Sequence, residues 1–476
     1  MIPQFKQGGP TEKTRWYPPQ IVSLAPEFTV AADRFCEYAH RLYALSIVHG
    51  EGGIVLEKDG ARADRYHLEC GERIVLKAGS LPSAHWGLAS LLQLMEPGQD
   101  GFYCQAGVWE DWPDVPYRGL MVDLARQWHP FELLLKYVDL CYVCKVNKLQ
   151  LHFTDDQSFT LPVSAFPKLS ASGRAYTREQ IARLAEYAFE RGIELIPEVD
   201  MPGHCGPFQR AYPELFGDTG VLPAGEEVFD ALRTVFQETA DLFPHSPCIH
   251  VGGDEASVES WGRCERTRQY MNEHGIAGLQ HMYAEYIRQI TERVLAMGRT
   301  PIVWEGFHKE YNHLISKKVL VIAWESYYQP AYDLAEGGFT LINASWKPLY
   351  VVTRKRYWPP EEILKWHPWL WQNWWEKSAA YPDGFTLDKE SCTVLGGQLC
   401  AWGDCLQDYE EPLEGCLDEL SLIAQRLPAL AEAAWNVKGD RTDFQASYPI
   451  CRQLIDRLLT DAKRPAAEQK EVPHAL

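Results

Sequence analysis

The chain has 476 residues, of which 46% are hydrophobic and 23% charged, a composition that suits a folded globular protein with a large core. Its net charge of −19 argues against nucleic acid or an anionic membrane as a partner, because both select a basic surface. We find no apolar stretch of transmembrane length and no apolar segment of a secretion signal at the N-terminus. The 13 cysteines are an odd number, and Cys141 and Cys144 fall in an apolar helical pattern. We therefore expect buried thiols and a cytoplasmic location.

Residues 1–112 are predicted to form an arm followed by a small α+β domain. Residues 1–25 are rich in Pro and Gly and show no periodicity, which is typical of an arm that wraps around the protein. Alternating segments near residues 53–57, 66–69 and 73–76 predict strands, and residues 83–94 have helical spacing. Because this region contains no cluster of acidic or metal-binding residues, we expect it to support the rest of the chain.

From Arg118 onwards, short apolar segments alternate with amphipathic helices. Thr177 and Gln180, for example, have the spacing of a capping box at the start of a helix over 178–191. Strands are predicted at residues 119–123, 148–154, 193–198, 248–251, 301–304, 319–324, 339–343 and 394–399. Eight strand–helix units predict an α/β fold, a (β/α)8 TIM barrel over residues 113–445, with a C-terminal helix and tail at 446–476. A doubly wound sheet is the alternative, but no Gly-x-Gly-x-x-Gly follows the first strand.

Polar and aromatic side chains gather where six of these strands end. The carboxyl ends of the strands are where active sites are built in this type of barrel. Capped turns alone do not explain six such ends in one chain. The residues concerned are Asp123, Asp155, Asp156, Glu198, Asp200, Asp254, Glu255, Trp304, Glu305, Trp324 and Glu325.

Residues 249–255, with the sequence Ile-His-Val-Gly-Gly-Asp-Glu, predict a buried strand that breaks into a tight turn. Taken alone, Asp254 and Glu255 are explained better by a capped turn with a salt bridge than by a functional site. The chain also has 17 Trp and 23 Tyr. Such an excess of flat aromatic faces is typical of sugar-binding clefts as well as of cores.

The same stretch resembles the His-x-Gly-Gly-Asp-Glu signature of glycoside hydrolase family 20, the β-N-acetylhexosaminidases. Further segments resemble the first three barrel strands of that family and its last strand with the helix that follows. These are residues 118–126, 147–157, 196–204, 396–402 and 426–435. The resemblance runs in order from about residue 60 to 436, and the N-terminal α+β domain also suits the family.

The resemblance implies a mechanism in which the 2-acetamido oxygen of the substrate attacks the anomeric carbon. Consecutive residues of an extended chain point apart, so Asp254 and Glu255 are poorly placed as a facing pair of carboxylates. In the family scheme Glu255 is the general acid and later the base, and Asp254 holds the acetamido N–H. Tyr350 would bind the acetamido carbonyl, and His204 with Asp155 would form a relay to Glu255. These roles need Asp254 ionised and Glu255 protonated. We expect no metal and no cofactor.

The resemblance also implies residues that bind the sugar. Arg118 and Asp200 would hold hydroxyl groups, although an arginine at a strand start is as often a structural ion pair. His250 is a further expected contact. Trp324, Trp371 and Trp402 would enclose the acetamido group and the ring, while Trp304 fits sugar contact and core packing equally well.

Two departures from the family concern the O4/O6 side of the sugar. Tyr350-Val-Val352 lacks the acid of the family's Tyr-x-Asp, and Trp402-Gly-Asp404 has Asp where the family has Glu. With Lys347 near in sequence, this subsite is less negative. We hypothesise tolerance of a bulky or anionic substituent there, such as a 6-sulfate.

The resemblance therefore implies an exo-acting retaining enzyme for terminal β-linked N-acetylglucosamine or N-acetylgalactosamine. The partner is an amino-sugar glycoside or oligosaccharide, and the oligomeric state stays open, a homodimer included. One alternative is an inactive sugar-binding protein on the same scaffold, and another is a disaccharide-releasing relative such as a lacto-N-biosidase.

Overall fold

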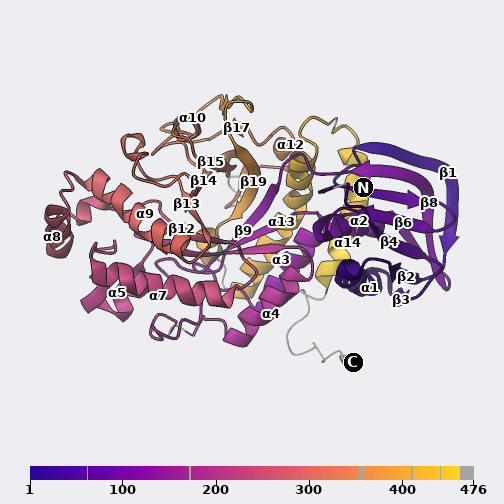
Figure 1. Cartoon of the computed structure of the whole chain (residues 1–476), viewed down its shortest axis with the longest axis horizontal. Coiled ribbons are helices and arrows are strands. Elements are labelled where there is room, and N and C mark those ends of the chain that lie inside the picture. The colour runs from indigo at the N-terminus through magenta and orange to yellow at the C-terminus, as the bar shows by residue number, and fades with distance from the viewer. Residues whose placement is uncertain (62, 171–172, 353–357, 409–410, 440, 461–476) are drawn as a thin grey trace.

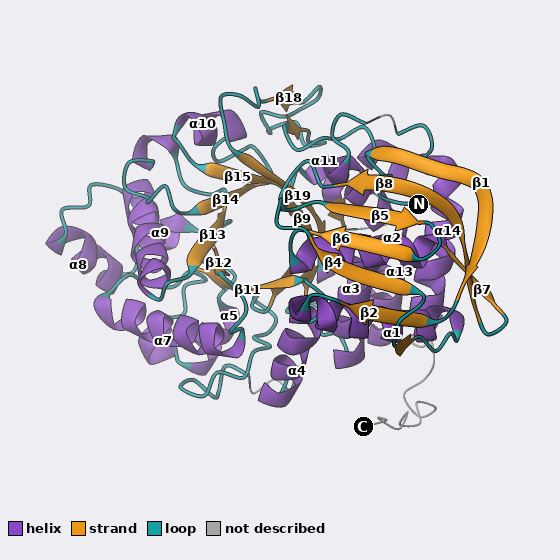
Figure 2. Ribbon diagram, turned by 45° about the vertical axis from the view of Figure 1, so that its right-hand side comes forward, coloured by secondary structure: helices purple, strands orange, loops and turns teal. Residues whose placement is uncertain are grey.

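The computed structural model describes residues 1–61, 63–170, 173–352, 358–408, 411–439 and 441–460. Eight parallel strands form a closed barrel, which Figure 2 shows as a ring. Each strand pairs with the next, and pairing of the last strand with the first closes the ring. This confirms the predicted (β/α)8 barrel. The strands are β9 (Tyr117–Asp123), β10 (Lys148–His152), β11 (Glu194–Met201), β12 (Cys248–Gly252), β13 (Thr300–Trp304), β14 (Leu320–Ala323), β15 (Thr340–Asn343) and β19 (Val394–Ala401).

Amphipathic helices surround the barrel. The helix after β10 begins at the predicted capping box of Thr177 and Gln180 and buries Ile181, Leu184 and Ala188. Its apolar residues recur at helical spacing, so one face packs on the strands and the other meets solvent. The outer helices are α3 (Phe131–Val143), α4 (Arg178–Phe189), α7 (Glu226–Leu242), α9 (Leu279–Ala296), α10 (Ala331–Glu336) and α13 (Pro412–Trp435). Shorter helices lie in the connections: α5 (Gly206–Ala211), α6 (Pro213–Phe216), α8 (Glu265–Glu273), α11 (Trp346–Leu349) and α12 (Pro360–Ile363).

The N-terminal α+β domain is a twisted sheet with two helices, α1 (Thr29–Tyr43) and α2 (Leu81–Leu94). Figure 1 shows it beside the barrel, next to α13 and α14 (Phe444–Leu459). Its strands lie in the order β1 (Gln7–Tyr17), β8 (Gly101–Asp111), β5 (Tyr66–Cys70), β6 (Ile74–Ala78), β4 (Ile54–Lys58), β2 (Gln20–Ser23) and β3 (Val48–His49), and β7 (Met95–Gly98) pairs with β8.

The expectation of an arm without regular structure over residues 1–25 is wrong, because this segment supplies β1 and β2. Strand β1 is the edge of the sheet and pairs only with β8. Most of its described side chains are exposed, so neither face has the apolar alternation that marks a half-buried strand. Its pairing depends on backbone hydrogen bonds, which leave no trace in the side-chain pattern.

The two parts share a core. Tyr142 and Val143 of α3, Trp435 of α13 and Leu454 and Leu458 of α14 pack into the cluster formed by the N-terminal sheet and its helices. Cys141 and Cys144, at the end of α3, are buried free thiols, as predicted. Within the part of the chain that the structure describes, no helix combines the length and apolar character needed to span a bilayer.

Candidate active site

A cavity of about 160 Å³ opens at the carboxyl ends of the barrel strands. Six predicted site residues line it: Asp254, Glu255, Trp324, Tyr350, Trp402 and Asp404. Arg126, Trp346 and Val352 complete the lining. The cavity therefore brings together two acids of one strand end and aromatic residues from loops far apart in the sequence.

The turn after β12 gives the two adjacent acids different surroundings. Gly252 and Gly253 have φ angles of 73° and 96°, a left-handed backbone that other residues rarely adopt. The turn leaves Asp254 only 6% exposed, whereas the side chain of Glu255 is 49% exposed. Glu255 itself has a φ of 46°, as does His204. Strained backbone of this kind is concentrated at functional sites.

Gly252 is also required by close packing. A Cβ atom at this position would lie 1.6 Å from Oδ1 of Asp200. We expect Gly252→Ala to lower the free energy of unfolding by about 3 kcal/mol and to displace the acids, so that activity is lost as well. Gly275→Ala is a matched control, because Gly275 has a φ of 66° and nothing within 4 Å of its Cβ position. Urea unfolding of both variants would measure the difference, and equal losses would contradict a packing role for Gly252.

Asp155, His204 and Glu255 form a chain of contacts from the barrel interior to the cavity. His204 Nδ1 lies 3.2 Å from Asp155 Oδ1, and its Nε2 lies 3.4 Å from Glu255 Oε2. Burial opposes a charge on His204, but its contacts with Asp155 and Glu255 outweigh burial and raise its pKa. The hydrogen bond with His204 in turn lowers the pKa of Glu255. The predicted relay is thus geometrically present.

Asp254 has the opposite electrostatic character. Burial raises its pKa to about 6, against the opposing charge of His204. Its Oδ1 atom has no hydrogen-bond partner among the described residues, and neither has Trp346 Nε1. A buried acceptor and a buried donor without partners are costly, so a ligand with both kinds of polar group would stabilise the cavity.

In this structure Glu255 therefore ionises more easily than Asp254, which is the reverse of the order that their expected roles need. A bound glycoside would change both environments. It would cover the half-exposed Glu255 and disfavour its charge, while an N–H donor at Asp254 would favour the carboxylate there. We therefore expect the order of ionisation to reverse when a glycoside binds.

Four aromatic rings form the walls. Tyr350 stacks parallel to Trp324, with centroids 6.1 Å apart and planes at 9°. Trp346 packs at 5.4 Å from Tyr350, and Trp402 lies 6.2 Å from it on another side. Such a box presents flat apolar faces, which suit the methyl group and the ring faces of an acetamido sugar.

Three expected sugar contacts lie below the cavity instead. His250 and Trp304 are buried in the barrel interior, where both contact Glu198: His250 Nδ1 lies 3.2 Å from Glu198 Oε1, and Trp304 Nε1 donates to the same oxygen at 2.7 Å. Asp200 is also buried, and its Oδ1 accepts a hydrogen bond from the Gly253 N–H at 3.2 Å. The expectation that these residues touch the sugar is wrong, since they do not line the cavity and lie beneath the turn after β12.

Arg118 is not in the cavity, and the expectation that it grips sugar hydroxyls is wrong. It lies at the opposite end of β9, fully buried, with its guanidinium 5.0 Å from the rings of both Trp86 and Trp435. Its Nε donates to the Lys145 carbonyl and its Nη1 to the Val115 carbonyl. These contacts make Arg118 a link between the barrel and the N-terminal domain.

Trp371 is also misplaced by the sequence interpretation. It is fully buried, donates from Nε1 to the Ala323 carbonyl and stacks on Phe385. Trp346 takes the place in the wall that Trp371 was expected to fill. Both lie in the long connection between β15 and β19, where periodicity does not fix the path of the chain.

The sequence interpretation missed Arg126, which follows the carboxyl end of β9. Its Nη1 lies 3.1 Å from Asp123 Oδ2 and its Nη2 lies 2.9 Å from Asp155 Oδ2, while its guanidinium packs over Trp402. The signal was available, because Arg126 belongs to the same quoted segment as Arg118 and stands at the end of the strand where sites are built.

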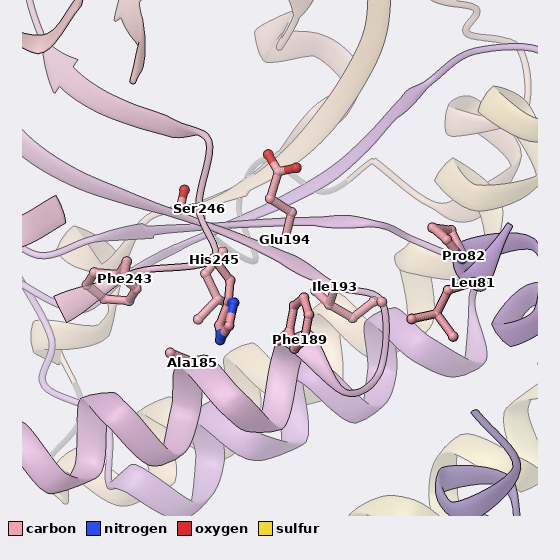
Figure 3. Close-up of a pocket in the computed structure, with 11 residues that line it drawn as sticks. Leu81, Pro82, Ala185, Phe189, Ile193, Glu194, Phe243, His245 and Ser246 are labelled. Atoms are coloured by element: carbon pink, nitrogen blue, oxygen red, sulfur yellow. The ribbon is translucent and has the colours of Figure 1, made fainter. Parts of the chain in front are cut away.

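Another cavity, of about 260 Å³, lies at the opposite ends of the strands, between α2, α4 and β11 (Figure 3). Phe189 stacks there on His245 with centroids 3.9 Å apart, and His245 contacts Glu186. Its lining is mainly apolar, with Glu194 as the one carboxylate among the described lining residues. It has no pair of acids, so the cavity at Asp254 and Glu255 is the candidate site.

A parallel barrel with a histidine-linked acid and an aromatic box at its carboxyl ends has the features of a carbohydrate-active enzyme of the glycoside hydrolase class. Residues 115–438 match the model of "Glycosyl hydrolase family 20, catalytic domain". The chain belongs to glycosyl hydrolase family 20, as the resemblance in its sequence predicted.

Relatives and solved structures agree with this assignment. A β-hexosaminidase of Akkermansia muciniphila is 31% identical over 427 residues, which cover 80% of this chain and 81% of the relative. The β-hexosaminidase subunit beta of Mus musculus is 28% identical over 400 residues, or 79% of this chain and 69% of the relative. The structure of an exo β-N-acetylglucosaminidase from Vibrio harveyi in complex with N-acetylglucosamine superposes with a TM-score of 0.83 at 22% identity, covering 98% of this chain and 78% of that one.

Proposed function

We propose that this chain is an exo-acting, retaining β-N-acetylhexosaminidase that releases terminal β-linked N-acetylglucosamine or N-acetylgalactosamine. The observation that carries the proposal is the contrast between the two adjacent acids. Asp254 is buried at the aromatic box with an unpaired oxygen, and Glu255 stands half exposed on the His204 relay. One acid is thus suited to hold a buried N–H and the other to exchange protons with a leaving group.

The proposed first step uses the substrate's acetamido group as the nucleophile. Its carbonyl oxygen attacks the anomeric carbon as the glycosidic bond breaks, and Glu255 gives its proton to the leaving oxygen. Asp254 accepts the acetamido N–H and stabilises the positive charge of the oxazolinium ion, while the Tyr350 hydroxyl donates to the acetamido oxygen. The buried position of Asp254 strengthens this charge stabilisation, because water does not screen it there.

The second step reverses these roles. Glu255, now a carboxylate, removes a proton from a water molecule that attacks the anomeric carbon, and the oxazolinium ring opens to restore the acetamido group. Two displacements at one carbon keep its configuration, so the product is the β-anomer. His204, held by Asp155, would keep its contact with Glu255 while Glu255 changes between its protonated and ionised states.

The test is hydrolysis of p-nitrophenyl N-acetyl-β-glucosaminide, followed by proton NMR of the first sugar released. We expect turnover, the β-anomer as the initial product, and inhibition by the N-acetylglucosamine thiazoline, which mimics the cyclised intermediate. Binding of N-acetylglucosamine without turnover would favour an inactive sugar-binding protein. Release of disaccharides in place of single sugars would favour a lacto-N-biosidase-like enzyme.

Tolerance of a 6-sulfate is the finer part of the proposal. Val352 presents an apolar side chain to the cavity. Burial opposes the charge of Arg126, but Asp123, Asp155 and, last, the lining residue Asp404 raise the pKa of its guanidinium. An arginine beside one short acid lowers the repulsion that an added sulfate would meet. We expect kcat/KM on 6-sulfated and plain N-acetylglucosaminides to differ by less than about tenfold, and Asp404→Glu to favour the plain sugar. A strong wild-type preference for the plain sugar would end the idea.

A further inference from the structure

Beside the candidate site lies a further cavity of about 260 Å³, which we call the second cavity. It is distinct from the cavity in Figure 3 and shares Glu255 with the candidate site. Glu255 lines both cavities, so its carboxyl stands at the boundary between them. The other lining groups with polar chemistry are Glu259, Gln280, Tyr283, Tyr327 and Tyr328. If the sugar to be released fills the first cavity, the leaving group protonated by Glu255 enters the second.

The walls of this second cavity are held in place by the turn after β12 and by the loop after β14. The Tyr283 hydroxyl donates to the carbonyl of Gly253. A Cβ atom on Gly306 would lie 2.2 Å from the same carbonyl oxygen, so the wall packs directly on the turn. The Tyr327 backbone N–H donates to Glu305 Oε1 at 3.0 Å. The cavity is therefore preformed.

Its chemistry suits a sugar ring. Tyr327 is 46% exposed and packs against Trp375 with centroids 4.9 Å apart, which leaves ring surface free for stacking. Gln280 offers a carboxamide that both donates and accepts hydrogen bonds, as sugar hydroxyls require.

Its charge is one-sided. Glu255 and Glu259 line it, and none of its described lining residues is a lysine, arginine or histidine. Lys377 packs on the Trp375 ring and is not part of the lining. Tyr328 reports the same field, because burial and then the nearby carboxylates of Glu255, Glu325 and Asp254 raise its pKa. An anionic group placed there would meet the carboxylate of Glu259, with no cationic side chain among the described lining residues to offset it.

We infer that this second cavity accepts the leaving group as a neutral sugar ring and selects against leaving sugars that carry a carboxylate or sulfate, with Glu259 as the specificity-determining residue. The inference rests on the proposed function and extends it to the other partner of the broken bond. It implies that the enzyme prefers neutral N-acetylhexosaminyl oligosaccharides and cleaves chains with a uronic acid at the next position more slowly.

A pair of substrates that differ in the charge of one carboxyl group, with a methyl group added in the ester, tests this. They are N-acetylglucosaminyl-β-1,4-glucuronic acid and its methyl ester, compared by kcat/KM at low ionic strength. The ester should be cleaved at least about fivefold faster, and added salt should narrow the gap, because salt screens charges at an exposed site. Glu259→Gln should reduce the preference for the ester by about threefold to fivefold. Glu51→Gln removes the same charge from an exposed loop of the N-terminal domain and should leave the preference unchanged.

The outcomes separate this inference from the proposed function. Release of p-nitrophenol from the simple glycoside with equal kcat/KM for acid and ester would overturn the inference alone. The inference would also be overturned if the Glu259→Gln variant, shown to be folded by its melting curve, kept the wild-type preference for the ester over the acid. Failure to cleave the p-nitrophenyl glycoside would overturn the proposed function itself.

Discussion

Glu255→Gln is expected to lower kcat/KM on an N-acetylglucosamine disaccharide by about 10²-fold to 10⁴-fold, the range that general acid catalysis contributes. With an activated dinitrophenyl leaving group the loss in the first step should be far smaller, because that phenolate departs with little need of a proton. The structure supports this role through the contact of Glu255 with His204 and its position between two cavities. Kinetics on a series of leaving groups would measure the difference, with Glu51→Gln as the control for charge.

Equal losses on both leaving groups would count against Glu255 as the acid. His204→Asn gives a second measurement. It removes the group that lowers the pKa of Glu255, so the limb of the pH profile that reports Glu255 should move to higher pH.

Asp254→Asn is expected to lower kcat by about 10²-fold or more whatever the leaving group is, because charge stabilisation of the oxazolinium ion is needed in every case. One limb of the wild-type kcat/KM profile should lie near pH 6, the pKa to which burial raises Asp254. The variant has no carboxyl group at this position and should lack that limb. Near wild-type turnover would remove Asp254 from the mechanism.

The same substitution should make the protein more stable at neutral pH. Burial raises the pKa of Asp254 to about 6, so the folded state holds this proton more tightly than the unfolded chain does. Its contribution to stability is thus most favourable below the unfolded pKa and falls as the pH rises through the folded pKa. Asp254→Asn should therefore gain about 2 kcal/mol at pH 7 and almost nothing at pH 4, which urea unfolding at both pH values would show. A variant that loses stability at pH 7 would contradict this account.

Much of the barrel could be predicted because its strands are short apolar segments with polar residues at one end. All eight predicted strands are present, and the turn at Gly252 brings Asp254 and Glu255 to the cavity. Strand β1 escaped prediction since an edge strand with exposed side chains has no apolar alternation. Local patterns describe what a segment buries, and β1 buries little.

The errors at the site have one physical cause. Arg118 and Arg126 stand at the two ends of one strand, eight positions apart, and only the strand's direction tells which end faces the cavity. Trp346 and Trp371 lie in a long connection whose path depends on tertiary packing. His250 and Trp304 point into the barrel, where Glu198 binds both. Residue type alone does not show whether a side chain lines the cavity or is buried beneath it.

The core shared by the barrel and the N-terminal domain determines whether the barrel can fold alone. Lys145 and Asp111 form an ion pair with both side chains fully buried, one in the barrel and one in the N-terminal sheet, and Trp435 donates a hydrogen bond to the same aspartate. A barrel cut free of residues 1–112 would keep a buried ammonium group without its counter-charge and expose the indole of Trp435 to water. The catalytic barrel is therefore not an excisable module, and the two parts should unfold together in one cooperative transition.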